Sequence, residues 1–244
     1  MVGAMFEELD YQMTSMGELI LRRRRSVSMR DTIVYEVKLD GAFLMSSLVR
    51  RSEEALAQIP LSGRNEDHEL AVLVGGLGLG HTAAAALGYS TVARVDVVES
   101  LAPVINWHKQ QLVPAADTLM DDPRCSLIEA DFFALIDGRE QGLVGAYDAI
   151  LVDIDHSPDS VLESGHDAFY TEPGMKQLSR WLNPGGAFGL WSADQPGQTF
   201  VQAVENVFST TNLHPVTFTN PNFSQKEQNW ILFAEATESA APGS

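Results

Sequence analysis

The sequence predicts an α/β protein in which a doubly wound sheet ends in an antiparallel hairpin and follows a small antiparallel β appendage. Three observations support this fold. Short apolar runs typical of buried strands alternate with helix-forming segments from residue 70 onward. Four glycines lie within six positions directly after the first run, at Gly75, Gly76, Gly78 and Gly80. The last two strand-like segments are joined by a loop too short for a crossover helix, so they should pair as a hairpin.

The composition limits the partners that the protein can have. The 244 residues carry a net charge of −17, and residues 61–244 hold 24 acidic against eight basic side chains. Such a surface repels nucleic acid and anionic membranes and suits cationic or neutral small molecules, although acidity that serves solubility alone is equally compatible. With one cysteine, Cys125, expected as a small buried hydrophobe, no disulfide framework or cysteine metal site is predicted. Without a signal-peptide core or an apolar run of about 18 residues, we expect a cytoplasmic protein.

Residues 1–61 are expected to form the appendage and a connecting helix. Residues 1–16 show no clear period, so no regular structure is predicted there. The predicted elements that follow are strands at 17–25, 32–40 and 42–46, a turn at 26–31 and a helix at 52–59. Four arginines, Arg22 to Arg25, would send two guanidinium groups to each face of a strand. One pair is expected in solvent and one in salt bridges, and a pair that binds an anion at the site is the alternative.

Residues 62–236 are expected to form the main domain after a polar linker at 62–69, with a disordered tail at 237–244. Its predicted strands are 70–74, 93–98, 125–130, 147–153, 187–191, 214–219 and 230–234. Its predicted helices are 82–87, 101–112, 173–182 and 199–208, of which the third is closed by the segment 183–186.

The glycine segment and Glu99 indicate a nucleoside site. Strand, glycine turn, helix and second strand follow one another, and the second strand ends on Glu99, whose carboxylate can accept both ribose hydroxyls. A glycine turn that serves packing alone is the alternative. The spacing to Glu99 is close to the ~20 residues of a dinucleotide site. The terminal hairpin and the lack of a second nucleotide-binding half nevertheless count against NAD.

Further candidates follow the next strands. Asp131 follows the third predicted strand, and Asp153, Asp155 and His156 follow the fourth. Because ligands of doubly wound sheets lie at the carboxyl ends of the strands, these side chains should meet Glu99 and the glycines there. His81 is expected to pack or cap a helix and Trp107 to lie in the core. Trp191 is expected to pack in the core, with a place in the wall of the acceptor pocket as the alternative.

Several ordered segments give the chain a resemblance to the spermidine synthase (polyamine aminopropyltransferase) family over roughly residues 17–235. The matching segments are 39–41, 54–61, 72–80, 98–99, 130–131, 147–155, 168–171 and 182–186. The resemblance implies the Rossmann-like fold of class I S-adenosylmethionine-dependent transferases. It also implies that Glu99 holds the donor ribose, that Asp131 binds the adenine amino group, and that Asp153 is the base for the attacking amine.

The chain departs from this family at the positions that contact the donor arm and the polyamine. Gly78 stands where the family has an aspartate that anchors the ammonium of the decarboxylated donor, and such a partly buried ion pair is worth a few kcal/mol. In the loop after the fourth strand, the second acid is shifted to Asp155 and His156 is added. Leu44 and Ser52 replace a glutamine and a tyrosine of the family.

These departures favour methyl transfer from S-adenosylmethionine to a small amine, because a neutral Gly78 tolerates the carboxylate of the full donor. Asp153, Asp155 and His156 are the expected catalytic residues, and no metal is expected. The first alternative is a genuine polyamine aminopropyltransferase that uses decarboxylated S-adenosylmethionine, with a site rebuilt from Asp155 and His156. The second is a non-catalytic nucleoside-binding or scaffold protein. A homodimer would cover the edge strands of the appendage.

Overall fold

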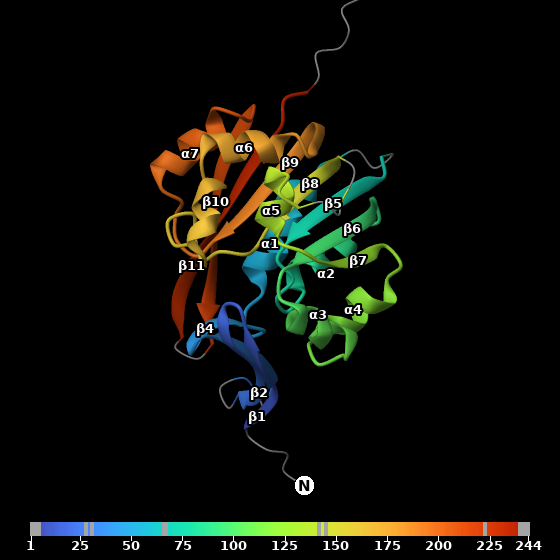
Figure 1. Ribbon diagram of the computed structural model, residues 1–244, viewed down its shortest axis with the longest axis vertical. Coiled ribbons are helices and arrows are strands. Elements are labelled where there is room, and N and C mark those ends of the chain that lie inside the picture. The colour runs from blue at the N-terminus through green and yellow to red at the C-terminus, as the bar shows by residue number, and fades with distance from the viewer. Residues whose placement is uncertain are drawn as a thin grey trace, which may run out of the picture.

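The computed structural model describes residues 6–26, 29, 32–64, 68–140, 143, 146–221 and 224–238. These residues form two sheets, with strand orders β1-β2-β3-β4 and β10-β11-β9-β8-β5-β6-β7. The small sheet lies beneath the large one in Figure 1. The predicted turn at residues 26–31 and the predicted tail at 237–244 lie largely outside the described residues.

The small sheet is built from four antiparallel strands: β1 (Phe6–Thr14), β2 (Gly17–Ser26), β3 (Thr32–Leu39) and β4 (Ala42–Ser46). The prediction that residues 1–16 lack regular structure is therefore wrong for β1. Most side chains of this edge strand are exposed, and its register shifts between Glu8 and Asp10, so its sequence has no alternating pattern. A tertiary contact holds it: the indole N–H of Trp107 donates to Asp10 Oδ2 at 2.6 Å.

Three of the four consecutive arginines form ion pairs on strand β2. Arg22 and Arg24 share one face and both contact the buried Glu36, at 2.7 and 2.6 Å. This confirms the predicted salt-bridged pair. Arg23 lies on the opposite face, half-exposed, and contacts Glu7 at 2.8 Å. Burial pushes the pKa of Glu36 upward, but the hydrogen bonds from the two arginines outweigh it and lower the pKa overall.

The large sheet has a parallel core and an antiparallel end. Its strands are β5 (Leu70–Gly75), β6 (Val92–Glu99), β7 (Cys125–Glu129), β8 (Tyr147–Val152), β9 (Leu182–Ser192), β10 (Thr210–Asn220) and β11 (Gln225–Glu235). Strands β5 to β9 are parallel, and β11 runs antiparallel to β9. The predicted doubly wound sheet with a terminal hairpin is confirmed. Residues 183–186, predicted to close a helix, instead lie in the first part of β9, where Gly185 has a φ of +71°.

Helices cover both faces of this sheet. Buried side chains of α1 (Arg51–Leu61), α2 (His81–Leu87), α3 (Ala102–Lys109) and α4 (Ala116–Asp121) share one hydrophobic cluster with β2 and β3. Those of α5 (Phe132–Asp137), α6 (Glu172–Ser179) and α7 (Gln198–Glu205) form the other cluster. Helices α4 and α5 were not predicted, because six residues are too few to show a helical period. Among the described residues, no helix is long and apolar enough to cross a membrane.

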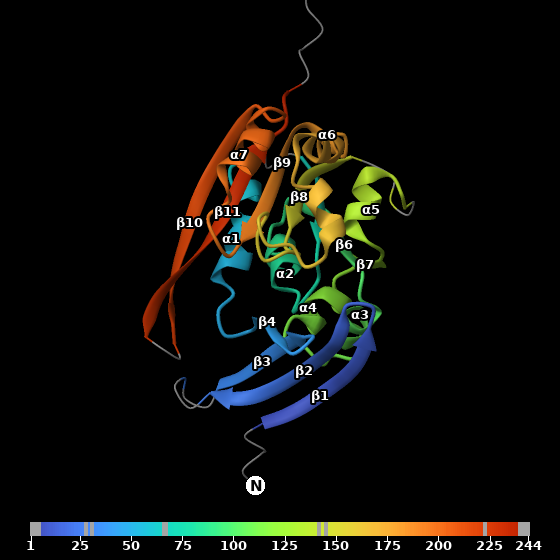
Figure 2. The ribbon, with the colours of Figure 1, turned by 60° about the vertical axis from the view of Figure 1, so that its left-hand side comes forward.

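The terminal hairpin is longer than predicted and reaches past the sheet that carries it. Strand β11 pairs with β9 only over Trp230 to Glu235, whereas β10 and β11 stay paired as far as Asn220 and Gln225. The free half of the hairpin extends toward the small sheet (Figure 2). Four residues of this free half, Phe218, Asn220, Glu227 and Asn229, line a cavity together with residues of the small sheet.

Candidate active site

The glycine loop connects β5 to α2 and lies against the end of β8. Gly76 has a φ of +92°, and a Cβ atom at this position would overlap the carbonyl oxygen of Asp153. At Gly80, with φ +84°, a Cβ would lie 2.7 Å from Cε1 of His108. A ring nitrogen of His108 in turn lies 3.0 Å from the carbonyl oxygen of Gly78. Only glycine fits these two positions, so the loop packs closely against the end of β8 and against His108 of α3.

Glu99 ends β6 and is held beside this loop. Its carboxylate accepts hydrogen bonds from the backbone N–H groups of Leu77, at 3.1 Å, and Leu101, at 2.8 Å. Burial raises the pKa of Glu99, and these backbone donors act in the opposite direction. The carboxylate is thereby oriented before any ligand binds.

Asp131 lies at the N-terminus of α5, one strand farther along the sheet. One of its oxygens accepts hydrogen bonds from Phe133 N, at 2.9 Å, and Ala134 N, at 3.2 Å, which is the geometry of a helix N-cap. Asp131 and Glu99 line the same cavity, whose volume is about 270 Å³ and which we call the smaller cavity. Gly76, Gly78 and the aromatic rings of Trp107 and Phe133 also line it.

Asp153 follows β8 and lies where the smaller cavity meets a larger one of about 600 Å³. Its Oδ2 accepts a hydrogen bond from Thr82 Oγ1 at 2.7 Å. Burial raises the pKa of Asp153 to about 6, and this hydrogen bond opposes the shift only in part. The two cavities also share lining residues around Asp153, namely Leu39, Leu44, Met45, Gly78, Ile154 and Leu162. They therefore form one connected site, at the point where strand order reverses on either side of β5.

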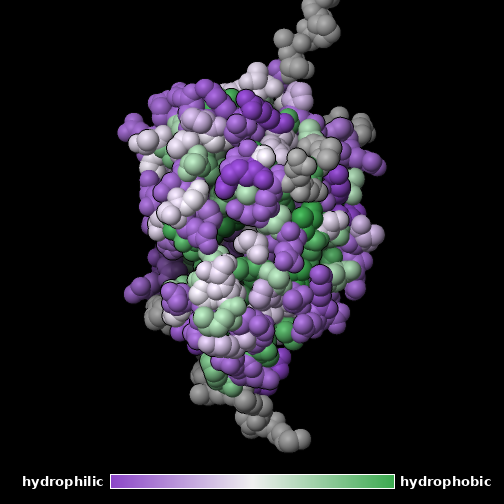
Figure 3. Space-filling view, viewed as in Figure 1, coloured by the Kyte–Doolittle hydropathy of each residue, from purple (hydrophilic) through white to green (hydrophobic). Residues whose placement is uncertain are grey.

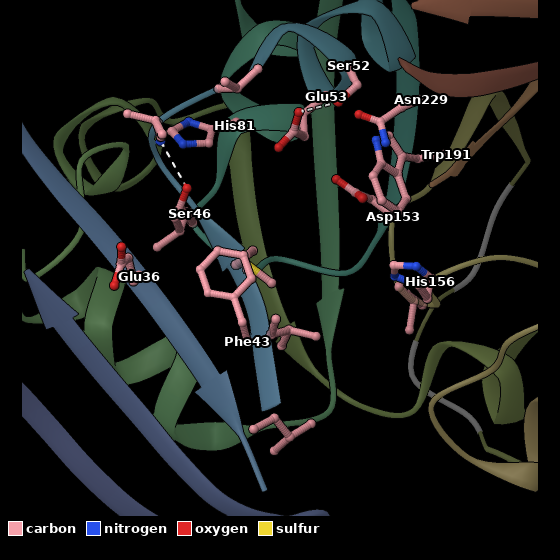
Figure 4. Close-up of a pocket in the computed structure, with 18 of the residues that line it drawn as sticks. Glu36, Phe43, Ser46, Ser52, Glu53, His81, Asp153, His156, Trp191 and Asn229 are labelled. Carbon is pink, nitrogen blue, oxygen red and sulfur yellow. Dashed lines mark hydrogen bonds between the residues drawn. The ribbon is translucent and has the colours of Figure 1, made fainter. Parts of the chain in front are cut away.

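The larger cavity lies between the two sheets and is assembled from distant parts of the chain. Strands β3 and β4, helix α1, the glycine loop, β9 and the free half of the hairpin all contribute to its lining. The face seen in Figure 3 is hollowed near its centre, with hydrophobic residues visible inside the hollow. Figure 4 shows Glu53, Asp153, Trp191 and Asn229 grouped around one space, with the carboxylates of Glu53 and Asp153 directed toward it.

The sequence prediction did not single out Glu53 or the hairpin residues Glu227 and Asn229. Glu53 lies in the first turn of α1, where an acidic residue is ordinarily explained by the helix dipole. The hairpin residues are about 150 positions from the glycine loop, and no local pattern connects them to it. Trp191 packs against the core, as expected, and it also lines the larger cavity, which was the stated alternative.

The histidine next to the glycine loop, His81, is partly buried in the lining of the larger cavity. His81 has its pKa lowered to about 4, first by burial and then by the charge of Arg50 and by His108, so it is neutral at pH 7. Its Nε2 atom has no hydrogen-bond partner within the described part of the chain.

Trp107, predicted to lie in the core, is buried there, with 1% of its surface exposed.

Asp155 and His156, which were also predicted to be catalytic, have surroundings that differ from those of Asp153. Asp155 is 4% exposed, and its carboxylate contacts three groups: His166 Nδ1 at 2.8 Å, Tyr170 Oη at 2.8 Å and Leu162 N at 2.7 Å. Through these contacts, Asp155 fixes the loop after β8. His156 is exposed and lies in the larger cavity's lining. Catalytic roles for the two residues remain predictions, and the geometry favours Asp153 over both.

His166 is another residue that sequence reasoning missed. It lies in the 3₁₀ turn Ser164–Ala168, packs on Phe133 with ring centroids 4.1 Å apart, and lines the smaller cavity together with Asp131. Burial opposes its protonation, but the hydrogen bond to Asp155 outweighs this and raises the pKa of His166 overall. No motif marks this histidine, because its partner Asp155 is defined only by the folded loop.

A doubly wound sheet that ends in an antiparallel hairpin, with a glycine loop after β5, is the fold of class I S-adenosylmethionine-dependent transferases. The family model described as Spermine/spermidine synthase domain matches residues 50–240. The chain belongs to this family.

Similar proteins agree with this membership. Polyamine aminopropyltransferase 2 of Pseudomonas aeruginosa is 27% identical over 212 residues, which are 82% of this chain and 57% of that relative. The chain thus spans little more than half the length of this curated protein. The crystal structure of spermidine synthase from Thermotoga maritima superposes with a TM-score of 0.71 at 18% identity, covering 93% of this chain and 72% of that one. A spermidine synthase in complex with the transition state analogue AdoDATO gives 0.70 at 17% identity, with the same coverage.

Proposed function

We propose that the protein is a polyamine aminopropyltransferase, which moves the aminopropyl group of decarboxylated S-adenosylmethionine to a small amine. The observation that carries this proposal is the junction at Asp153 between the smaller cavity, which holds Glu99 and Asp131, and a larger cavity lined by carboxylates. Methyl transfer, which the sequence favoured, finds no support among the relatives, whose names describe aminopropyl transfer or spermidine synthesis. The first alternative drawn from the sequence replaces it.

The smaller cavity suits the nucleoside of the donor. Glu99 offers a fixed carboxylate to the ribose hydroxyls, and Asp131 lies farther along the cavity for the adenine amino group. Gly76 and Gly78 line the smaller cavity beside Asp153 and add no side chain to it. With the nucleoside placed this way, the sulfonium lies near the junction and its aminopropyl arm enters the larger cavity.

The transfer is a single displacement. The nitrogen of a neutral amine attacks the propyl carbon bonded to sulfur, the carbon–sulfur bond breaks, and both electrons of that bond stay on sulfur. Methylthioadenosine leaves, and the new secondary ammonium passes one proton to a base. An in-line arrangement of nucleophile and sulfonium lowers the barrier because both reactants are already oriented.

Asp153 is the base in this proposal. Proton transfer needs a group that is ionised near neutral pH but still binds a proton, and burial raises the pKa of Asp153 to about 6. Thr82 orients the carboxylate through its hydroxyl. Asp155 and Tyr170 keep the loop after β8 in place through their hydrogen bond of 2.8 Å.

A direct assay tests the proposal. The purified protein is incubated with decarboxylated S-adenosylmethionine and putrescine, and methylthioadenosine and spermidine are quantified by chromatography and mass spectrometry. We expect both products in equal amounts from the wild type, and their formation about 10²–10⁴-fold slower with Asp153→Asn. A parallel incubation with S-adenosylmethionine tests methyl transfer, and products only in that incubation would refute the proposal. If the donor binds without turnover of any tested amine, the scaffold alternative is favoured. The homodimer and the cytoplasmic location stay predictions.

A further inference from the structure

Glu53 is a carboxylate that the proposed mechanism does not use. It faces the larger cavity from the first turn of α1, and Ser52 Oγ donates to its Oε2 at 2.8 Å. Figure 4 shows its carboxylate directed toward the same space as that of Asp153. Helix α1 packs directly on α2, which begins after the glycine loop. Glu53 is therefore held beside the loop and across from Asp153.

The surroundings of Glu53 supply no compensating cation among the described residues. On its own helix, Arg50 contacts the exposed Glu54 at 2.9 Å. His81 on α2 is neutral at pH 7, since its pKa is about 4. Arg24, which lines the same cavity, is paired with Glu36 at 2.6 Å. His156 is exposed in this lining, and the nearest charge from β8 is Asp153 itself.

The electrostatic consequence is a carboxyl group that holds a proton near neutrality. Burial, followed by the charge of Asp153, raises the pKa of Glu53 to about 7. An ammonium group in this space would favour the ionised form of both carboxyls and relieve their repulsion. A carboxylate of a ligand would have the opposite effect, so the pair would repel the carboxylate of full S-adenosylmethionine.

We infer that Glu53 binds the terminal ammonium of the donor's aminopropyl arm. The inference rests on the proposed function. Gly78 and the rest of the loop at residues 75–80 offer no carboxylate to that ammonium. The donor ammonium keeps its charge throughout the reaction, whereas the attacking amine must lose a proton to Asp153. If the donor ammonium and the attacking amine contact different carboxylates, Asp153 stays free to act as the base. Thr82 donates to Asp153, whereas Glu53 accepts from Ser52, so Glu53 is the carboxylate available for the donor ammonium.

Calorimetric titration with two ligands tests this assignment. Decarboxylated S-adenosylmethionine carries the ammonium, and methylthioadenosine lacks the whole aminopropyl arm. For Glu53→Gln we expect a loss in affinity for the donor of about 10- to 100-fold, the range for one charged hydrogen bond, with methylthioadenosine binding unchanged. Glu54→Gln is the matched control, because it makes the same change one residue away on an exposed side chain, and it should leave both affinities unchanged.

Proton release gives a second readout that a structural role would not produce. A group with a pKa near 7 that becomes fully ionised on binding releases about half a proton at pH 7. Titrations in buffers of different ionisation enthalpy should show this release with the donor and wild type. They should show none with methylthioadenosine, and with Glu53→Gln no more than about a tenth of a proton, which Asp153 can release at pH 7.

The outcomes separate this inference from the proposed function. If the wild type binds neither compound, the proposed function fails and the inference fails with it. If both compounds bind and Glu53→Gln keeps full affinity for the donor, the inference alone is wrong. Equal losses for both ligands, or a loss confined to the KM of the amine, also refute it.

Discussion

The two cavities of the site differ in how their carboxylates are held. In the smaller cavity, Glu99 and Asp131 accept two backbone N–H groups each, from residues close to them in sequence or from the adjoining loop. In the larger cavity, Glu53 and Asp153 each accept one side-chain hydroxyl. Backbone donors fix the first pair for a neutral nucleoside. Burial also raises the pKa of Glu99, but several backbone donors oppose that shift. The second pair has fewer donors, and its pKa values rise to about 7 for Glu53 and about 6 for Asp153, which suits it to bind cations and move protons.

Asp153→Asn should cause the largest loss of activity. The amide cannot accept the proton of the attacking amine, so kcat should fall by about 10²–10⁴, the usual range for a general base. Donor affinity should change by no more than a few fold, because the nucleoside contacts lie elsewhere. Stopped product assays and calorimetry measure the two quantities separately. A variant with normal kcat would remove Asp153 from catalysis.

Glu99→Gln should affect the other cavity and therefore both nucleosides. An amide presents one acceptor instead of two beside Leu77 and Leu101, and its NH₂ group faces their N–H donors. We expect losses of about 10- to 100-fold for methylthioadenosine and the donor alike, corresponding to about 1.5–3 kcal/mol. If only the donor were affected, Glu99 would contact the aminopropyl arm instead of the ribose.

Gly78→Asp in the Glu53→Gln background would move a carboxylate from the helix to the loop. Aspartate tolerates the left-handed backbone, with φ +47° at this position, better than most residues do. Its Cβ would lie 2.8 Å from Met45 Sδ, the flexible end of a side chain. Donor affinity should recover by up to about 10-fold, as one charged hydrogen bond is regained. Gly78→Asn, which adds no charge, is the control and should not restore it.

Glu53→Gln should stabilise the protein without ligand at alkaline pH. In the folded protein, the pKa of Glu53 is raised from 4.5 to about 7, so stability falls as pH rises through this interval. Removing the charge should recover about 1–3 kcal/mol at pH 8, a Tm increase of a few degrees, and little at pH 4. Thermal melts of wild type, Glu53→Gln and Glu54→Gln at both pH values test this. A constant Tm difference would show that ionisation of Glu53 is not the cause.

His156→Ala should have the smallest effect. This side chain is exposed at the larger cavity, and its ring makes no hydrogen bond within the described parts of the chain. We expect changes of about threefold or less in kcat/KM, equivalent to well under 1 kcal/mol. A loss comparable to that of Asp153→Asn would restore the catalytic role predicted from sequence.

The sequence by itself determined the fold class, the glycine loop, and the positions of Glu99, Asp131 and Asp153 at strand ends. These features depend on residues near one another in the chain, because strand period, turn chemistry and the residue after a strand are local properties. Parallel strands then bring their carboxyl ends to one edge, so local patterns were sufficient to group the carboxylates.

The tertiary structure decided what the larger cavity contains. It brought Glu53 opposite Asp153 by packing α1 on α2, enclosed the cavity with the free half of the hairpin, and directed Asp155 to His166 and Tyr170. It also made β1 a strand through Trp107 and Asp10. Each of these results depends on contacts between segments far apart in the chain. Burial and charge proximity at such contacts set the pKa of a side chain, and no local pattern in the sequence records them.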